Sequence, residues 1–110
     1  LVGIDGYQWG SREDFMSQLD ANLDMLTKFA EKNGKIAALT ECGLKNLSEP
    51  DWWTTALLPI VEKYPISYFL VWRNASHEWF GPSPSKPDAD SFREFYADDK
   101  TLFLRDIVNE

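Results

Sequence analysis

The feature of this sequence that most constrains its fold is a short uncharged run at residues 36–40, which reads Ile-Ala-Ala-Leu-Thr. Such a run predicts a strand that is covered on both faces, as strands of parallel sheets are. Glu41 follows the run directly, and Gly43 is a residue that can turn the chain sharply. Because ligands and catalytic groups of parallel α/β folds gather at the carboxyl ends of strands, Glu41 is the first candidate for a functional residue. The structural alternative is that Glu41 caps the next helix or pairs with a surface lysine.

The segments around this run repeat the pattern of parallel folds. Residues 1–8 predict a short buried strand with a polar end, and residues 66–72 predict a third strand. Between the first two strands, apolar residues recur at helical steps of three and four: Phe15, Leu19, Leu23, Leu26 and Ala30. Ser11 predicts the start of this helix, and Asn33-Gly34 predicts its end. Strand, helix and strand within about 40 residues make one βαβ unit, so we expect parallel pairing.

The second half of the chain predicts less regular structure. A second helix is expected to begin near Pro50, and Pro59 is expected to kink it or end its regular part. Residues 75–88 contain three prolines and form a long irregular loop, a length that often indicates function. Residues 91–96 predict a short helix after this loop.

Composition narrows the classes of function. The net charge of −7 and the absence of a lysine or arginine cluster predict that the chain binds neither nucleic acid nor an anionic membrane. No segment approaches the roughly 20 apolar residues that span a bilayer, so no membrane insertion is expected. The single cysteine, Cys42, excludes an internal disulfide. Because the sequence begins with Leu1 inside a predicted strand, we expect it to be a piece of a longer protein.

Polar and aromatic side chains stand at the ends of all three predicted strands. Asp5 and Tyr7 close the first strand, Glu41 closes the second, and Trp72 and Arg73 close the third. Parallel strands place these ends side by side, where they would form a cleft suited to binding and attacking a polyhydroxy ligand. Each residue also has a structural alternative, such as a surface ion pair for Arg73 or a place in the core for Trp72.

Three ordered segments resemble glycoside hydrolase family 26, a family of β-mannanases with a few related β-glucanases and xylanases. Residues 2–7 resemble its sixth-strand GxDxY segment, residues 39–43 its seventh-strand TExG segment, and residues 66–75 its eighth-strand ISYxLVWRNA segment. Residues 90–103 are similar to the family's last helix. The resemblance implies an α/β fold, a parallel three-stranded βα fragment that corresponds to the last three units of a (β/α)8 TIM barrel.

The resemblance also implies roles for individual residues. Glu41 becomes the nucleophile, with Tyr7 as its hydrogen-bonding neighbour. The residues implied to bind substrate near the cleaved sugar are Asp5, Tyr7, Trp72, Arg73 and His77. The implied activity is retaining hydrolysis of a β-1,4-linked mannan or similar β-glycan by a secreted, periplasmic or cell-surface enzyme. No metal or organic cofactor is implied, and His77 has no second ligand at metal-site spacing.

The family's acid/base glutamate belongs to its fourth strand, which no segment of this sequence resembles. Glu78 beside His77 imitates the sequence context of that residue, but it lies in a loop, and general acids need a fixed position. We therefore expect residues 1–110 to be an incomplete catalytic domain that does not hydrolyse glycans alone and that self-associates through uncovered sheet edges. Two alternatives stay open, a carbohydrate-binding module that uses the aromatic residues and a small α/β domain of unrelated function.

Overall fold

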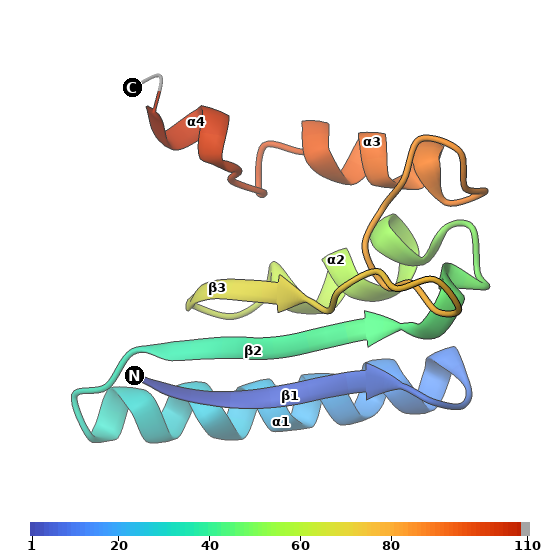
Figure 1. Ribbon diagram of the computed structural model, residues 1–110. Coiled ribbons are helices and arrows are strands. Elements are labelled where there is room, and N and C mark those ends of the chain that lie inside the picture. The colour runs from blue at the N-terminus through green and yellow to red at the C-terminus, as the bar shows by residue number, and fades with distance from the viewer. Residues whose placement is uncertain (109–110) are drawn as a thin grey trace.

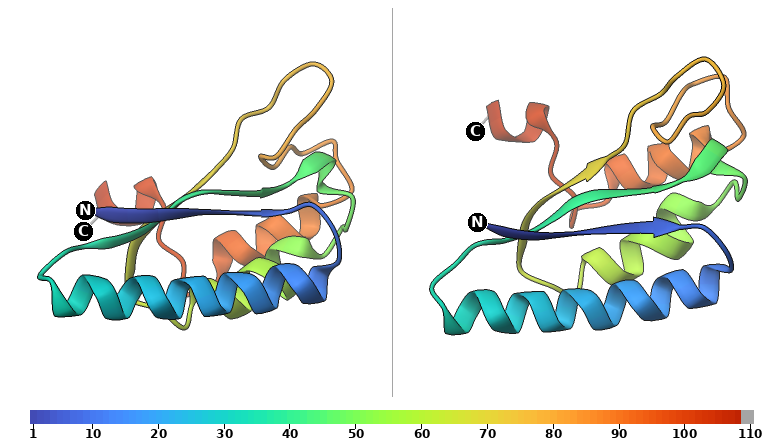
Figure 2. Two further views of the ribbon diagram at one scale, coloured as in Figure 1. Left: turned by 90° about the horizontal axis from the view of Figure 1, so that it is seen from below. Right: turned by 60° about the horizontal axis from the view of Figure 1, so that its bottom comes forward.

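The computed structural model describes residues 1–108, which form a three-stranded sheet with helices packed against it (Figure 1). The elements, in chain order, are β1 (Val2–Gln8), α1 (Arg12–Lys32), β2 (Ala37–Leu44), the 3₁₀ turn η1 (Lys45–Leu47), the π-helical segment η2 (Trp53–Leu57), α2 (Leu58–Val61), β3 (Ile66–Val71), α3 (Ala89–Ala97) and α4 (Leu104–Val108). Figure 2 shows α1, α2 and α3 on one side of the sheet, while the loop after β3 rises on the other side.

The sheet has the order β1-β2-β3, and both pairs of strands are parallel, as the sequence predicts. The register between β1 and β2 shifts at one point. Ile4 lies opposite Leu39, but the next residue of β1, Asp5, lies opposite Glu41. Thr40 is therefore the extra residue of a β-bulge, a feature that bends a strand and re-aims the side chains that follow.

Helix α1 has the predicted start, end and buried face. Its first turn is capped by Ser11, whose Oγ accepts a hydrogen bond from the backbone N–H of Asp14 at 3.1 Å. It ends at Lys32, and Gly34 takes a left-handed φ of 62°. Its buried residues are the five that the helical spacing singles out: Phe15, Leu19, Leu23, Leu26 and Ala30. Helix α1 therefore covers one face of β1 and β2.

The core lies between the sheet and the helices, and large aromatic rings fill its centre. Trp52, Trp53 and Phe95 are almost fully buried, and the two indole rings meet edge to face with centroids 5.1 Å apart. Both indole N–H groups have acceptors. Trp52 donates to Gln8 at 3.0 Å, and Trp53 donates to Asp88 at 2.8 Å. Much of the aromatic content therefore builds the core, and the three helices around it disfavour a mostly β binding module.

The second helix is short and irregular around Pro59. Its first part is the π-helical segment η2, in which the backbone N–H of Leu58 donates to the carbonyl of Trp53. Pro59 has no N–H and cannot continue the α-helical hydrogen bonds, so the wider turn directly before it has a physical cause. The helix is irregular directly before Pro59, but it does not end there, because α2 continues through Pro59 to Val61.

The expected sharp turn at Gly43 is wrong, because β2 continues through Gly43 to Leu44. The glycine is needed for a different reason. A Cβ atom at this position would lie 2.6 Å from Cδ1 of Phe80, a residue of the loop after β3. Gly43 therefore gives the Phe80 ring room to lie against the backbone of β2.

Candidate active site

Tyr7 and Glu41 meet at the carboxyl ends of β1 and β2. The Tyr7 hydroxyl donates a hydrogen bond of 2.6 Å to Oε1 of Glu41. The two side chains therefore point to the same end and the same face of the sheet, as the cleft predicted from the sequence requires. Within residues 1–108 the second carboxylate oxygen of Glu41, Oε2, has no hydrogen-bond partner. It is the oxygen that remains available to a ligand.

The bulge at Thr40 aims Glu41 toward the open face of the sheet. Leu39 and Cys42 belong to the core on the helix side. The hydroxyl of Thr40 donates to Oδ1 of Asp5 at 2.8 Å, on the face that also carries the Tyr7 ring. The two residues between Leu39 and Cys42 thus both face away from the helices, which a regular strand with alternating side chains does not allow. Among residues 1–108, this hydroxyl is the hydrogen-bond donor to the Asp5 carboxylate.

The surroundings of Tyr7 keep its hydroxyl protonated. Burial raises the pKa of Tyr7 above its ordinary value, and the hydrogen bond and negative charge of Glu41 raise it further, with a smaller contribution from Asp5. An ionised carboxylate can only accept hydrogen bonds, so the proton of this pair resides on Tyr7. Tyr7 is suited to orienting the Glu41 carboxylate without taking its charge.

Two aromatic rings and two asparagines support Tyr7. Trp9 stacks on Tyr7 with ring centroids 5.4 Å apart, and Phe80 meets Tyr7 edge to face at 5.7 Å. Asn74 holds Phe80 in place, because its Oδ1 accepts from the Phe80 N–H at 3.0 Å. Asn46, which has a positive φ of 59°, makes two hydrogen bonds to Trp79, the residue before Phe80. Its Oδ1 accepts from the Trp79 N–H at 3.1 Å, and its own backbone N–H donates to the Trp79 carbonyl at 2.7 Å. Sequence reasoning missed Trp9 and Phe80, because only the folded chain shows that they contact Tyr7, and it missed Asn46, which pairs with the backbone next to Phe80.

The end of β3 supplies the third side of the site, but less closely. The Trp72 side chain is 38% exposed, and its backbone N–H still pairs with the carbonyl of Cys42 at 3.1 Å. Arg73 and His77 are exposed, and neither makes a hydrogen bond or an ion pair within the described part of the chain. Glu78 lies 3.7 Å from the Lys45 ammonium. The fold thus brings the strand ends together, while the roles of Asp5, Trp72, Arg73 and His77 stay predictions.

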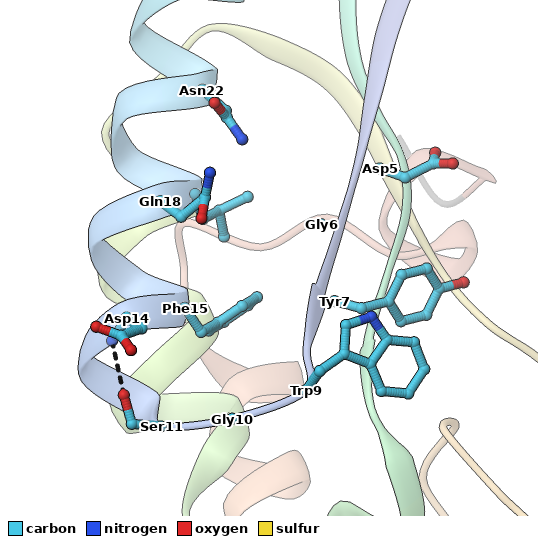
Figure 3. Close-up of a pocket in the computed structure, with 11 residues that line it drawn as sticks. Asp5, Gly6, Tyr7, Trp9, Gly10, Ser11, Asp14, Phe15, Gln18 and Asn22 are labelled. Atoms are coloured by element: carbon cyan, nitrogen blue, oxygen red, sulfur yellow. Dashed lines mark hydrogen bonds between the residues drawn. The ribbon is translucent and has the colours of Figure 1, made fainter.

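A pocket of about 450 Å³ lies between β1 and α1 (Figure 3). Gln18 and Asn22 point into it from α1, and Trp9 lies at its rim. Because β1 has a partner strand on only one side among residues 1–108, this pocket is the groove along an open sheet edge. Glu41 does not line it.

Residues 1–108 show no cluster of metal ligands, no exposed thiol and no membrane-spanning helix. No group of three or more histidine, cysteine, aspartate or glutamate side chains among these residues could hold a metal ion. Cys42 is buried, and burial raises the pKa of its thiol to about 12, so it is a poor nucleophile. No described helix is long and apolar enough to cross a bilayer.

The fold of this chain is similar to the solved structures of several enzymes. No family model matches the chain. A family 26 β-mannanase from Bacteroides ovatus superposes with a TM-score of 0.91 at 44% identity, over 94% of this chain and 31% of that protein. The catalytic domain of a family 26 endo-β-1,4-mannanase from Bacillus sp. JAMB-750 superposes with a TM-score of 0.81 at 28% identity, over 94% of this chain and 32% of that protein. A modular endo-β-1,4-mannanase from Cellulomonas fimi superposes with a TM-score of 0.81 at 28% identity, over 94% of this chain and 25% of that protein.

These structures share the three parallel strands and flanking helices of this chain within larger TIM barrels. The chain spans about a third or less of the length of each of the three proteins. The predicted fold class, a three-stranded βα fragment of such a barrel, is confirmed.

Proposed function

Because the chain belongs to glycoside hydrolase family 26 and corresponds to the last three βα units of its barrel, we propose that residues 1–110 are one part of a single catalytic domain. The parent enzyme is a retaining endo-β-1,4-glycan hydrolase, and β-mannan is the substrate that we favour. One observation carries this proposal: the tyrosine hydroxyl of β1 donates to the carboxylate at the carboxyl end of β2, in a barrel whose catalytic groups collect at that end.

In the proposed reaction Glu41 is the nucleophile. Its free oxygen attacks the anomeric carbon and forms a glycosyl-enzyme, while a general acid protonates the departing glycosidic oxygen. The same acid then acts as a base, removes a proton from water, and the water releases the sugar with its original configuration. The Tyr7 hydroxyl, neutral because of its raised pKa, keeps the carboxylate oriented through Oε1 and leaves Oε2 to react.

The acid/base of this reaction has no convincing candidate among residues 1–108. A retaining enzyme holds its two carboxyl groups about 5–5.5 Å apart on opposite sides of the scissile bond. Asp5 is a direct neighbour of Glu41 on the adjacent strand, on the same side, and is bonded to Thr40. Glu78 is turned to Lys45. We therefore infer that the acid/base comes from another part of the parent barrel and that residues 1–110 alone do not hydrolyse glycans.

Substrate binding and location follow from the same proposal. Exposed Trp72 offers a ring face to a sugar, and Asp5, Arg73 and His77 offer hydrogen-bonding groups at the strand ends. The natural substrate would be a polysaccharide too large to enter a cell. We propose that the parent enzyme is secreted, periplasmic or bound to the cell surface.

A chimeric barrel tests the nucleophile directly. Residues 1–110 replace the matching segment of the Bacteroides ovatus β-mannanase, with which they share 44% identity. The chimera is expected to hydrolyse mannan with retention of configuration, observed by proton NMR, and Glu41→Gln should lower kcat by at least about a thousandfold. Glu78→Gln is the matched control and should keep the activity. A Glu41→Gln chimera with an unchanged circular dichroism spectrum and more than about a tenth of the parental kcat would contradict the assignment.

The isolated chain provides a second test. We expect no turnover of soluble mannan, β-glucan or xylan by residues 1–110, and association that rises with concentration in light scattering. Apolar side chains beside the outer edge of β3 are exposed in the single chain: Leu102, Leu104, Ile107 and Val108. Exposed apolar surface and unpaired strand edges both favour association. Turnover by a purified monomer that disappears in Glu78→Gln would show that the loop carboxylate is the acid.

A further inference from the structure

Trp9 is the most exposed aromatic side chain among residues 1–108, at 73% exposure, yet it is not loosely placed. Its indole stacks on the Tyr7 ring with 5.4 Å between the centroids and 22° between the planes. Figure 3 shows the indole on the same side of β1 as Asp5 and the Tyr7 ring, away from the side chains of α1. Strand alternation places residues 5 and 7 on one face, which is the face of Glu41, and Trp9 follows the end of β1 and stacks on Tyr7 there.

The backbone on both sides of Trp9 is fixed by buried or capped residues. Gln8 is 2% exposed, its amide donates to Glu49 and to the carbonyl of Gly10, and its Oε1 accepts from the Trp52 indole. Two residues after Trp9, Ser11 caps α1. Trp9 thus stands between two anchored positions with a free ring face. Fixing a binding group before the ligand arrives reduces the entropy lost on binding.

Tyr7 separates the Trp9 ring from Glu41, the proposed nucleophile. Tyr7 contacts Trp9 through its ring and Glu41 through its hydroxyl, so the face of Trp9 lies beyond Tyr7 and not over the carboxylate. Trp72 stands on the other side of β2, at the end of β3. A glycan chain that runs across the three strand ends would therefore meet an indole on each side of Glu41.

We propose that Trp9 is a binding platform for a pyranose ring of the glycan, at a position next to the sugar that Glu41 attacks. This inference rests on the proposed glycosidase function and adds a contact that the sequence motifs do not assign. The apolar face of a pyranose stacks on an indole, and its hydroxyl groups stay in solvent. Asp5 and Glu41 nearby, with the net charge of −7, favour a neutral glycan over one rich in carboxylates.

The test compares long and short substrates in the chimeric barrel. Trp9→Ala is expected to raise KM for mannohexaose about tenfold with kcat nearly unchanged, because one stacked sugar contact is lost. 4-Nitrophenyl β-mannoside, which places its single sugar at the attacked position and none over Trp9, should show a much smaller change. Trp9→Phe keeps an aromatic face and should restore most of the affinity. Phe29→Ala, which removes an exposed aromatic from the far end of α1, is the matched control and should show no dependence on substrate length.

The outcomes separate this inference from the proposed function. An equal loss of kcat on both substrates would show that Trp9 acts only by positioning Tyr7, and an unchanged KM would show that it touches no sugar; either overturns the inference. If Trp9→Ala does not fold by circular dichroism, Trp9→Leu keeps an apolar side chain without a ring, and calorimetric titration of its Glu41→Gln form with mannohexaose reads the same loss. A folded chimera that is active with Trp9 intact but insensitive to Glu41→Gln would instead refute the proposed function.

Discussion

The two faces of the sheet differ in how deeply their side chains are buried. On the helix face the rings of Trp52, Trp53 and Phe95 are buried, and both indole N–H groups have acceptors. On the open face the side chains of Leu70 and Trp72 are about two-fifths exposed. The difference shows that the helix face holds the fold together, while the open face can carry exposed rings and charges because it contributes less to stability.

The strongest test of this contrast is a change on the helix face. Trp53→Ala is expected to lower the free energy of unfolding by about 3–5 kcal/mol, because it opens a cavity in the core and leaves the Asp88 carboxylate without its indole donor. Urea denaturation of the chain, followed by circular dichroism, measures the loss. Trp72→Ala on the open face is the matched change and should cost about 1 kcal/mol or less. Equal losses from the two variants would break the comparison.

A smaller loss of stability is expected at Gly43, where the Phe80 ring packs closely against the backbone of the open face. Gly43→Ala should cost about 1–3 kcal/mol, because the new methyl group meets the Phe80 ring. Phe80→Leu in the same chain should return part of this loss, so the two substitutions are expected to be strongly non-additive in urea denaturation. If their costs simply add, Gly43 is constrained by something other than Phe80.

The smallest effect on stability, and a clear effect on titration, is expected at Tyr7. Burial, followed by the hydrogen bond to Glu41, raises the pKa of Tyr7, so the folded chain holds the phenol proton more tightly than the unfolded chain does. The stability that this difference contributes is lost as the pH rises above 10.0, the ordinary tyrosine value, because the unfolded chain then releases the proton first. Ultraviolet absorbance should show that Tyr7 is one of the phenols that titrate late. Glu41→Gln should lower its pKa only in part, since burial is the larger cause.

The control for that titration is Tyr64, whose pKa is raised to about 12 mainly by its hydrogen bond to Asp20. Tyr64→Phe should remove a second late component and leave the Glu41-dependent one in place. If the component lost in Tyr64→Phe is the only late one, and Tyr7→Phe and Glu41→Gln leave the titration unchanged, the assigned state of Tyr7 is refuted.

How much the sequence could predict depended on the distance over which each signal acts. The buried face of α1 and its capping by Ser11 come from local spacing, and both were predicted. The turn at Gly43 was wrong because the reason for that glycine, Phe80, lies far along the chain. The bulge at Thr40 could not be seen either, because a register is a property of two strands. The meeting of Tyr7 and Glu41 was predicted from strand order, whereas the support from Phe80 and Trp9 needed the fold.

The bulge at Thr40 has a consequence for protein engineering. The direction of the Glu41 side chain depends on the number of residues before it in β2, so deletion of Thr40 would turn this carboxylate toward the helices, although every chemical group of the site would still be encoded. The same threonine also fills the space over Gly3, where a Cβ atom would collide with its side chain. Strands β1 and β2 are therefore matched parts, and a graft that moves the Glu41 segment into another barrel must bring the Gly3 strand with it.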